Sequence, residues 1–261
     1  MTETADAPSA DAAATLSAPP PIDPRRHALF LDFDGTLAPF AATPDAVSVP
    51  VAIVETLGAL TGALDGAIAI VTGRTLAEVD RYLAPLTPTA AAVHGLVVRH
   101  GRDGQIDQQP ADTGALLRVG AAFDGVARGL PGVLVERKSH SVALHWRRAP
   151  EREDGIVAEA ESIVGANPSL VLQRGKCVAE ARTSGRDKGD AIVDLLADPV
   201  FAGRLPVFAG DDVTDERGFI AVNARDGVSI KVGDGPTAAR FRLGDVAAVH
   251  AWLSASAAPG D

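Results

Sequence analysis

In the first part of the chain, short continuous apolar runs alternate with segments whose apolar residues recur at helical spacing. An apolar run over residues 27–34 ends in carboxylates and predicts a buried strand that opens into a turn. Residues 50–64 carry apolar side chains at helical spacing, residues 67–71 repeat the buried-strand pattern, and residues 75–83 read as a short helix. The order strand, helix, strand, helix predicts parallel strands covered by helices.

The middle of the chain has a different pattern. Residues 95–105 predict a hairpin with glycine-containing turns, and residues 113–130 predict a helix. The following segments predict four strands and one helix, namely strands over 133–137, 141–147, 170–173 and 176–182, and a helix over 151–164. Antiparallel strands combined with helices are an α+β pattern.

The last part returns to alternation of helices and strands. Helices are expected over 187–196, 215–222 and 245–253, and strands over 206–209 and 228–232. The expected fold class is therefore α/β, with a Rossmann-like doubly wound core and an inserted α+β domain.

The same patterns divide the chain into a core domain, an inserted domain and two terminal segments. Residues 25–108 and 184–256 are expected to form the core domain, and residues 109–183 the inserted domain. Residues 1–24 are rich in Ala and Pro with little large apolar surface, which predicts a disordered tail, and residues 254–261 are expected to fray.

Composition narrows the classes of partner. The chain of 261 residues has a net charge of −10 and no Lys/Arg-rich run, which argues against nucleic-acid or anionic-membrane partners. The single cysteine cannot form an internal disulfide. No signal-peptide pattern or membrane-length apolar stretch is recognised, so a cytoplasmic protein is expected.

Carboxylates gather at the ends of two predicted strands. Asp32 and Asp34 end the first strand, and Asp211 follows a later one. Ligands of open α/β sheets bind at the carboxyl ends of strands, where crowded carboxylates must protonate or share a cation. Mg²⁺ suits oxygen ligands of this kind. Asp212 and Asp215, taken singly, are better explained as caps of turns or helices.

Two further polar residues suit a phosphate. Lys188 lies at a predicted helix start, where a cation opposes the helix dipole unless an anion binds; a solvated lysine is the alternative. Thr72 follows a buried strand, and its hydroxyl and neighbouring N–H groups suit a phosphate oxygen. Together the groups predict phosphoryl transfer, with Asp32 as nucleophile and Asp34 as general acid and base.

The motifs resemble those of the haloacid dehalogenase superfamily of phosphatases. Asp32-Phe-Asp-Gly-Thr36, Thr72, Lys188 and Gly210-Asp-Asp-Val-Thr-Asp-Glu216 occur in the superfamily's order. The resemblance implies that Mg²⁺ is held by the side chains of Asp32 and Asp211 and by the backbone carbonyl of Asp34.

From Phe30 to Trp252 the chain also resembles one family within that superfamily, the trehalose-6-phosphate phosphatases. The segments that carry this resemblance are 32–39, 71–74, 94–95, 175–180 and 210–216. It implies hydrolysis of trehalose 6-phosphate to trehalose and phosphate by a monomer, with the inserted domain closing over the sugar as a cap. The residues that it implies for substrate binding are Arg74, Glu136, Lys138, His145, Lys176 and Glu180.

Two other functions remain open at this stage. One is a phosphatase for a different sugar phosphate, because only the cap residues would decide the substrate. The other is a phospho-accepting signalling module, which also combines acidic residues, a Thr and a Lys around Mg²⁺. Asp34 favours the enzyme, because a second carboxylate near the nucleophile would speed hydrolysis of the acyl phosphate.

Overall fold

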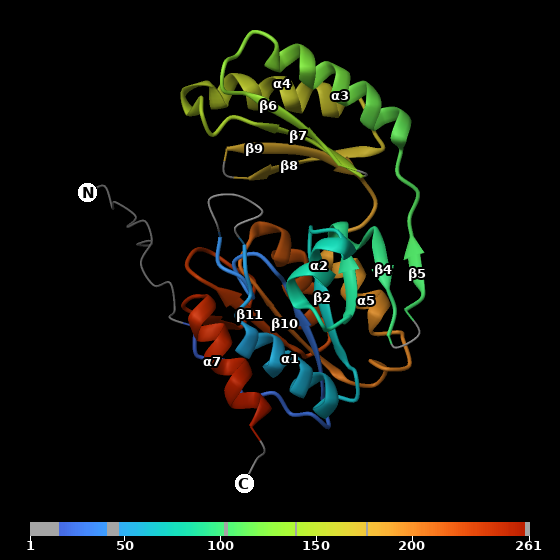
Figure 1. Cartoon of the computed structure of the whole chain (residues 1–261), viewed down its shortest axis with the longest axis vertical. Helices are drawn as coiled ribbons and strands as arrows, with labels where there is room; N and C mark the ends of the chain where they lie inside the picture. Colours follow the sequence, from blue (N-terminus) through green and yellow to red (C-terminus); the bar gives the residue numbers. More distant parts are fainter. Residues whose placement is uncertain (1–15, 41–46, 102–103, 139, 176, 259–261) are drawn as a thin grey trace, which may run out of the picture.

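Two β-sheets stacked along the long axis of the molecule organise the chain (Figure 1). The structure is a computed structural model that describes residues 16–40, 47–101, 104–138, 140–175 and 177–258. None of the described helices is long and apolar enough to cross a membrane.

The larger sheet has eight strands in the order β12-β11-β10-β1-β2-β3-β4-β5. From β12 to β3 neighbouring strands run parallel, and β4 and β5 are added in antiparallel fashion. Its strands are β1 (His27–Leu31), β2 (Ile68–Val71), β3 (Thr89–Ala92), β4 (Val97–Arg99), β5 (Ile106–Gln108), β10 (Leu205–Gly210), β11 (Val228–Val232) and β12 (Phe241–Leu243).

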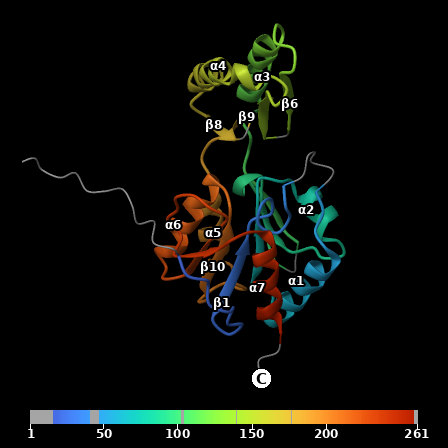
Figure 2. The same cartoon turned by 90° about the vertical axis from the view of Figure 1, so that its left-hand side faces the viewer.

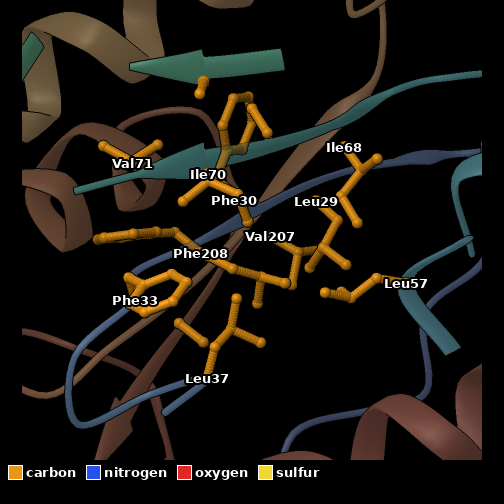
Figure 3. Close-up of a cluster of buried hydrophobic side chains, with 14 of the residues drawn as sticks. Leu29, Phe30, Phe33, Leu37, Leu57, Ile68, Ile70, Val71, Val207 and Phe208 are labelled. Carbon is orange, nitrogen blue, oxygen red and sulfur yellow. The ribbon is translucent and has the colours of Figure 1, made fainter. Parts of the chain in front are cut away.

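Helices cover both faces of this sheet. Figure 2 shows α5 (Lys188–Leu195) and α6 (Glu216–Asn223) on one side of β1 and β10, and α1 (Val51–Ala63) and α7 (Val246–Ala257) on the other. Because both faces are buried, β1 and β2 are continuous apolar runs rather than alternating ones. Their side chains pack together with those of β10 (Figure 3).

The smaller sheet has four antiparallel strands in the order β6-β7-β9-β8. They are β6 (Leu134–Arg137), β7 (Ser141–His145), β8 (Leu170–Gly175) and β9 (Val178–Thr183). Helices α3 (Thr113–Ala127) and α4 (Glu153–Gly165) cover the face that points away from the larger sheet (Figure 1). The smaller sheet and its helices bury their own hydrophobic cluster around Phe123 and Trp146.

The remaining short elements lie between the strands. They are α2 (Leu76–Leu83) and the 3₁₀ helices η2 (Val93–Gly95), η3 (Pro150–Arg152) and η4 (Val213–Asp215). The turn at η2 and the loops after β1, β2 and β10 lie at the carboxyl ends of the parallel strands, which face the smaller sheet (Figures 1 and 2).

The predicted fold class is confirmed, and most predicted elements occur with shifted ends. Strands β3 and β12 were not predicted. The sequence of β3 is Thr-Ala-Ala-Ala, which has little β-propensity but is buried between β2 and β4, and β12 has only three residues. The hairpin predicted over 95–105 is formed by β4 and β5, but its second strand begins only at Ile106.

At both chain ends the described residues differ from the prediction. Helix α7 continues to Ala257, so fraying from residue 254 is not observed. In the predicted tail, Ile22 is buried, and the carbonyls of Ser17 and Pro20 accept hydrogen bonds from Arg242 and Trp252. Residues 1–15 and 259–261 lie outside the described residues. The two ends order each other by contact, which the pattern of either end alone does not predict.

Candidate active site

The predicted nucleophile lies where β1 ends. The backbone N–H of Asp32 donates to the carbonyl of Ala209 on β10 at 2.9 Å, so the residue stays in the register of the sheet. The chain then turns sharply: the N–H of Gly35 donates to the carbonyl of Ala38 at 2.7 Å, and Gly35 has a φ of 77°. A Cβ at position 35 would lie 2.2 Å from Oδ2 of Asp211, so only glycine fits beside that carboxylate.

Two buried carboxylates and one half-buried carboxylate meet at this end of the sheet. Oxygens of Asp32, Asp211 and Asp215 lie within 4.8 Å of one another. Nζ of Lys188, the first residue of α5, lies 2.8 Å from Oδ1 of Asp32 and 2.7 Å from Oδ1 of Asp215. The structure therefore brings together Asp32, Asp211 and Lys188 as the sequence predicts, and adds Asp215.

Asp215 was interpreted from the sequence as a cap, and it is one: its Oδ2 accepts a hydrogen bond from the N–H of Asp212 at 2.9 Å. Its side chain is nevertheless fully buried beside Lys188. An acidic residue shortly after a strand that ends in glycine is typical both of a helix cap and of an active-site carboxylate. The sequence pattern alone does not show which of these roles Asp215 has.

Burial sets the electrostatics of the cluster. Desolvation, followed by the charge of Asp215, raises the pKa of Asp32 well above its usual range despite the contact with Lys188. The same two causes raise the pKa of Asp211 to about 7. Burial alone would lower the pKa of Lys188, but the charges of Asp215 and Asp32 outweigh it and raise that pKa.

These residues fit a divalent cation. Lys188 contacts Asp32 and Asp215, and Lys231 donates to the backbone carbonyl of Asp211. Two ammonium groups therefore face three carboxylates, and one negative charge stays uncompensated when all are ionised. Oδ1 of Asp211 is buried and has no hydrogen-bond partner among the described residues. All the available ligand atoms are oxygens, which magnesium-type ions prefer.

Asp34 points to a different surface from Asp32. Both of its carboxylate oxygens accept hydrogen bonds from Arg74, one from Nε and one from Nη2, each at 2.7 Å. The guanidinium also stacks near the rings of Phe33 and Tyr82 and pairs with Glu78 at 3.2 Å. Arg74 is therefore fixed from several sides and holds Asp34 in one orientation.

Thr72 is buried where β2 ends. Its Oγ1 accepts a hydrogen bond from the N–H of Arg74 at 3.1 Å, and its carbonyl accepts one from the N–H of His94 at 2.9 Å. The turn after β3 thus braces the turn after β2, and both open toward the smaller sheet.

The smaller sheet presents one polar face. Ala143 on β7 pairs with Glu136 on one side and Glu180 on the other, so these two carboxylates share a face. His145 is two residues farther along β7 on that face, and its Nε2 lies 2.9 Å from Oε2 of Glu136. Nζ of Lys138 lies 3.3 Å from Oε1 of Glu180.

A cavity of about 290 Å³ lies between this face and the ends of the parallel strands. Six of the residues that line it were predicted from the sequence as catalytic or substrate-binding residues. The predicted substrate-binding residue Lys176 lies outside the described residues. They are Asp34, Arg74, Glu136, Lys138, His145 and Glu180.

The sequence analysis gave no site role to several residues of the cavity wall, although His94 lies in a segment that carries the family resemblance. They include Glu78, His94, His140, Ser141 and Arg182. Ser141 and Arg182 are cross-strand partners on the polar face, and Oγ of Ser141 donates to Oε1 of Glu180 at 2.5 Å. Strand parity could have found both, since Arg182 is two residues from Glu180 on β9 and Ser141 is four residues from His145 on β7.

Known proteins match over most of the chain. The family model for trehalose-phosphatase matches residues 30–247. A trehalose-6-phosphate phosphatase of Escherichia coli is 39% identical over 87% of this chain and 85% of its own length. A probable trehalose-phosphate phosphatase of Sinorhizobium fredii is 40% identical over 86% of this chain and 84% of its own.

Solved structures of trehalose-6-phosphate phosphatases align with most of the chain. The trehalose-6-phosphate phosphatase of Aspergillus fumigatus aligns with a TM-score of 0.64 at 26% identity, over 92% of this chain and 99% of that one. The C-terminal domain of the Candida albicans enzyme aligns with a TM-score of 0.79, over 92% of this chain and 98% of that one; at 21% identity it supports the fold alone.

Proposed function

The chain belongs to the trehalose-phosphatase family, and we propose that it hydrolyses trehalose 6-phosphate to trehalose and phosphate through an aspartyl-phosphate on Asp32. The observation that carries the proposal is the buried contact of Asp32 with Lys188 at the end of β1, beside a polar cavity that a sugar phosphate would fill.

The chemistry divides into two steps. An oxygen of Asp32 attacks phosphorus, and the bond between phosphorus and the sugar oxygen breaks while Asp34 gives that oxygen a proton. A water molecule then passes a proton to Asp34 and attacks phosphorus, which releases phosphate and restores the carboxylate of Asp32. Lys188 keeps Asp32 oriented and neutralises charge near the phosphate, and the Thr72 hydroxyl binds a phosphate oxygen.

Asp34 must change partners during this cycle. In the structure its two oxygens are occupied by Arg74. We assign Arg74 to positioning Asp34 at the edge of the cavity as well as to the substrate binding that the sequence implied, because its guanidinium lines the same wall.

Asp32 and Asp211, with the backbone carbonyl of Asp34, would hold Mg²⁺, and Asp215 is the additional carboxylate within reach. When bound, the cation would neutralise charge on the phosphate and on the carboxylates around it.

The polar face of the smaller sheet would recognise the disaccharide. Carboxylates and cations in fixed pairs offer acceptors and donors to sugar hydroxyls, and Glu136, Lys138 and Glu180 are held in such pairs. We keep Lys176 in this set on the family resemblance alone.

The division into a core (25–108 and 184–256) and a cap (109–183) belongs to the same proposal. Two separate sheets and two separate hydrophobic clusters support it. Closure of the cap would exclude water from the cavity. A cytoplasmic location and a monomeric state remain predictions from the sequence.

A panel of phosphate-release assays tests the function. The purified protein is incubated with trehalose 6-phosphate, sucrose 6-phosphate, glucose 6-phosphate and p-nitrophenyl phosphate, each with Mg²⁺ or with EDTA. We expect trehalose 6-phosphate to be hydrolysed with the highest kcat/KM, and EDTA and Asp32→Asn each to abolish release. A higher kcat/KM for another sugar phosphate would refute the substrate assignment, and appreciable release by Asp32→Asn would refute the nucleophile.

A further inference from the structure

His94 lies in the wall of the cavity in an unusual backbone conformation. Val93, His94 and Gly95 have φ values of 50°, 55° and 91°, in the left-handed region that bulky residues rarely adopt. The strained turn is held by two hydrogen bonds, from the N–H of Val93 to the carbonyl of Arg74 at 3.0 Å and from the N–H of His94 to the carbonyl of Thr72 at 2.9 Å. Strain that is braced in this way is characteristic of functional sites.

These two hydrogen bonds hold the imidazole of His94 against the turn after β2. A Cβ at Gly73 would lie 2.7 Å from Nε2 of His94 and 2.8 Å from its Cε1, so glycine at position 73 leaves the space that the ring occupies. The ring therefore lies directly beside the turn that carries Thr72 and Arg74.

Neither ring nitrogen of His94 has a hydrogen-bond partner among the described residues, although the side chain lines the cavity with Asp34 and Glu180. The side chain is half-buried, and its nitrogens are not among the fully buried polar atoms without a partner in the described residues, so they open to the cavity and are available to substrate or water. His145, by contrast, is paired with Glu136 on the opposite wall.

The charge environment fixes the form of the ring. Burial, then the positive charges of Lys188, Arg182 and Lys138, lower the pKa of His94 to about 3. The imidazole is therefore neutral at physiological pH, with one donor and one acceptor nitrogen. The geometry agrees with this neutral form, because the ring lies against Gly73, next to Thr72 and Arg74, in the wall of the cavity.

We propose that His94 is a substrate-binding residue whose imidazole hydrogen-bonds a hydroxyl of the sugar ring that carries the phosphate. The proposal rests on the proposed function, because it takes the cavity as the sugar site. It assigns the ring to recognition of the sugar and the backbone of the same turn to bracing Thr72.

Three variants separate the side chain's polar atoms from its shape. His94→Phe keeps a ring against Gly73 and removes both nitrogens. His94→Asn and His94→Gln restore an amide close to the position of Nδ1 or of Nε2 respectively. Each is assayed with trehalose 6-phosphate and with p-nitrophenyl phosphate, which carries no sugar, and the melting temperature of each is measured.

We expect His94→Phe to lower kcat/KM for trehalose 6-phosphate roughly tenfold, mainly through KM, and to change p-nitrophenyl phosphate turnover less than twofold. Either Asn or Gln should retain more activity than Phe, and the better one identifies the bonding nitrogen. Equal losses on both substrates, with a lowered melting temperature, would make the role purely structural and overturn the proposal.

The proposal is also overturned if His94→Phe keeps wild-type kinetics, or if neither amide improves on Phe in folded protein. Should His94→Phe fail to fold, the two amide variants decide the question by their substrate selectivity against wild type. Wild-type protein without activity on trehalose 6-phosphate refutes the proposed function itself. An active wild type with an unaffected His94→Phe refutes only the assignment of His94.

Discussion

At the scale of single residues, the two carboxylates of the first motif differ in environment although only one residue separates them. Asp32 is 4% exposed and contacts Lys188, whereas Asp34 faces the cavity and is bound by Arg74. A buried carboxylate against an ammonium group suits attack on phosphorus, and a carboxylate at the cavity edge suits proton exchange with the leaving oxygen and with water. The sharp turn at Gly35 lets neighbouring positions take such different roles.

A substitution of Glu180 tests the proposed sugar-binding face of the smaller sheet. It is held by Ser141 and Lys138, so its carboxylate is oriented before substrate arrives. We expect Glu180→Ala to raise KM for trehalose 6-phosphate by about tenfold, because a charge-assisted hydrogen bond is lost, while kcat falls less. Steady-state kinetics measure both constants.

Glu161→Ala is the matched control for this variant. Glu161 is also an acidic residue of the smaller domain, but it lies on α4 and forms only an exposed pair with Arg174. Its removal should leave KM unchanged. Unchanged kinetics for Glu180→Ala would remove Glu180 from the sugar site.

At the scale of elements, the sequence predicts best where burial and periodicity agree. Strand β1 from Ala28 onward and the whole of β2 are apolar and end in polar motifs, so both their existence and the position of the site followed from the sequence. Strand β3 is built from Thr89 and three alanines and has no such signal; its neighbours in the sheet determine its conformation.

The same physical reasons decide which residues of the site could be predicted from the sequence. Asp32, Asp211 and Lys188 could be predicted to meet because they follow or flank strands of one sheet. His94 and Ser141 reach the cavity through a left-handed turn and through cross-strand register, and both depend on tertiary contacts.

The contact between the N-terminal segment and helix α7 leads to a prediction about stability. Ile22 is 5% exposed, and its N–H donates to Oγ of Ser256 at 3.2 Å on α7. We expect Ile22→Ala to destabilise the protein by about 2 kcal/mol, which is the low end for truncating a buried Ile. For a chain of this size that corresponds to a melting temperature lowered by about 4–8 °C, measured by differential scanning fluorimetry.

Ser17→Ala provides the control. Ser17 is exposed and contributes its backbone carbonyl to the N–H of Arg242, which an alanine keeps. Its melting temperature should equal that of wild type within about 1 °C. An equally small change for Ile22→Ala would mean that residues 17–22 add no stability to α7.

At the scale of the whole molecule, two connections join the sheets, and polar contacts lie across both. The side chain of Gln108, at the end of β5, is 3.1 Å from Nε2 of His140 in the smaller sheet's β6–β7 turn. On the second connection, Nη1 of Arg182 donates to the carbonyl of Arg186 at 3.0 Å, just before α5 begins with Lys188. These contacts tie the smaller sheet to the end of β5 and to the segment that leads into α5.

The acidic cluster makes the stability of the whole molecule depend on pH and on a divalent cation. Because the pKa of Asp211 is raised to about 7 in the folded protein and is 3.8 ordinarily, the folded state binds more protons than the unfolded state between these values. Without a cation, stability should therefore fall as pH rises from about 4 to 7. A cation that binds the ionised carboxylates would restore it above pH 7.

We therefore expect Mg²⁺ to raise the melting temperature more at pH 8 than at pH 5.5, where protons compete for the same oxygens. At a concentration 100 times its dissociation constant, the cation would add about 2.7 kcal/mol to the free energy of unfolding. The shift is measured by fluorimetry in EDTA and in Mg²⁺ at both pH values. Asp211→Asn should lose most of it, and Asp212→Asn, whose side chain only caps η4, should keep it. An equal shift at both pH values, or one that survives in Asp211→Asn, would place the cation elsewhere, because neither result is compatible with ligation by a carboxylate at position 211.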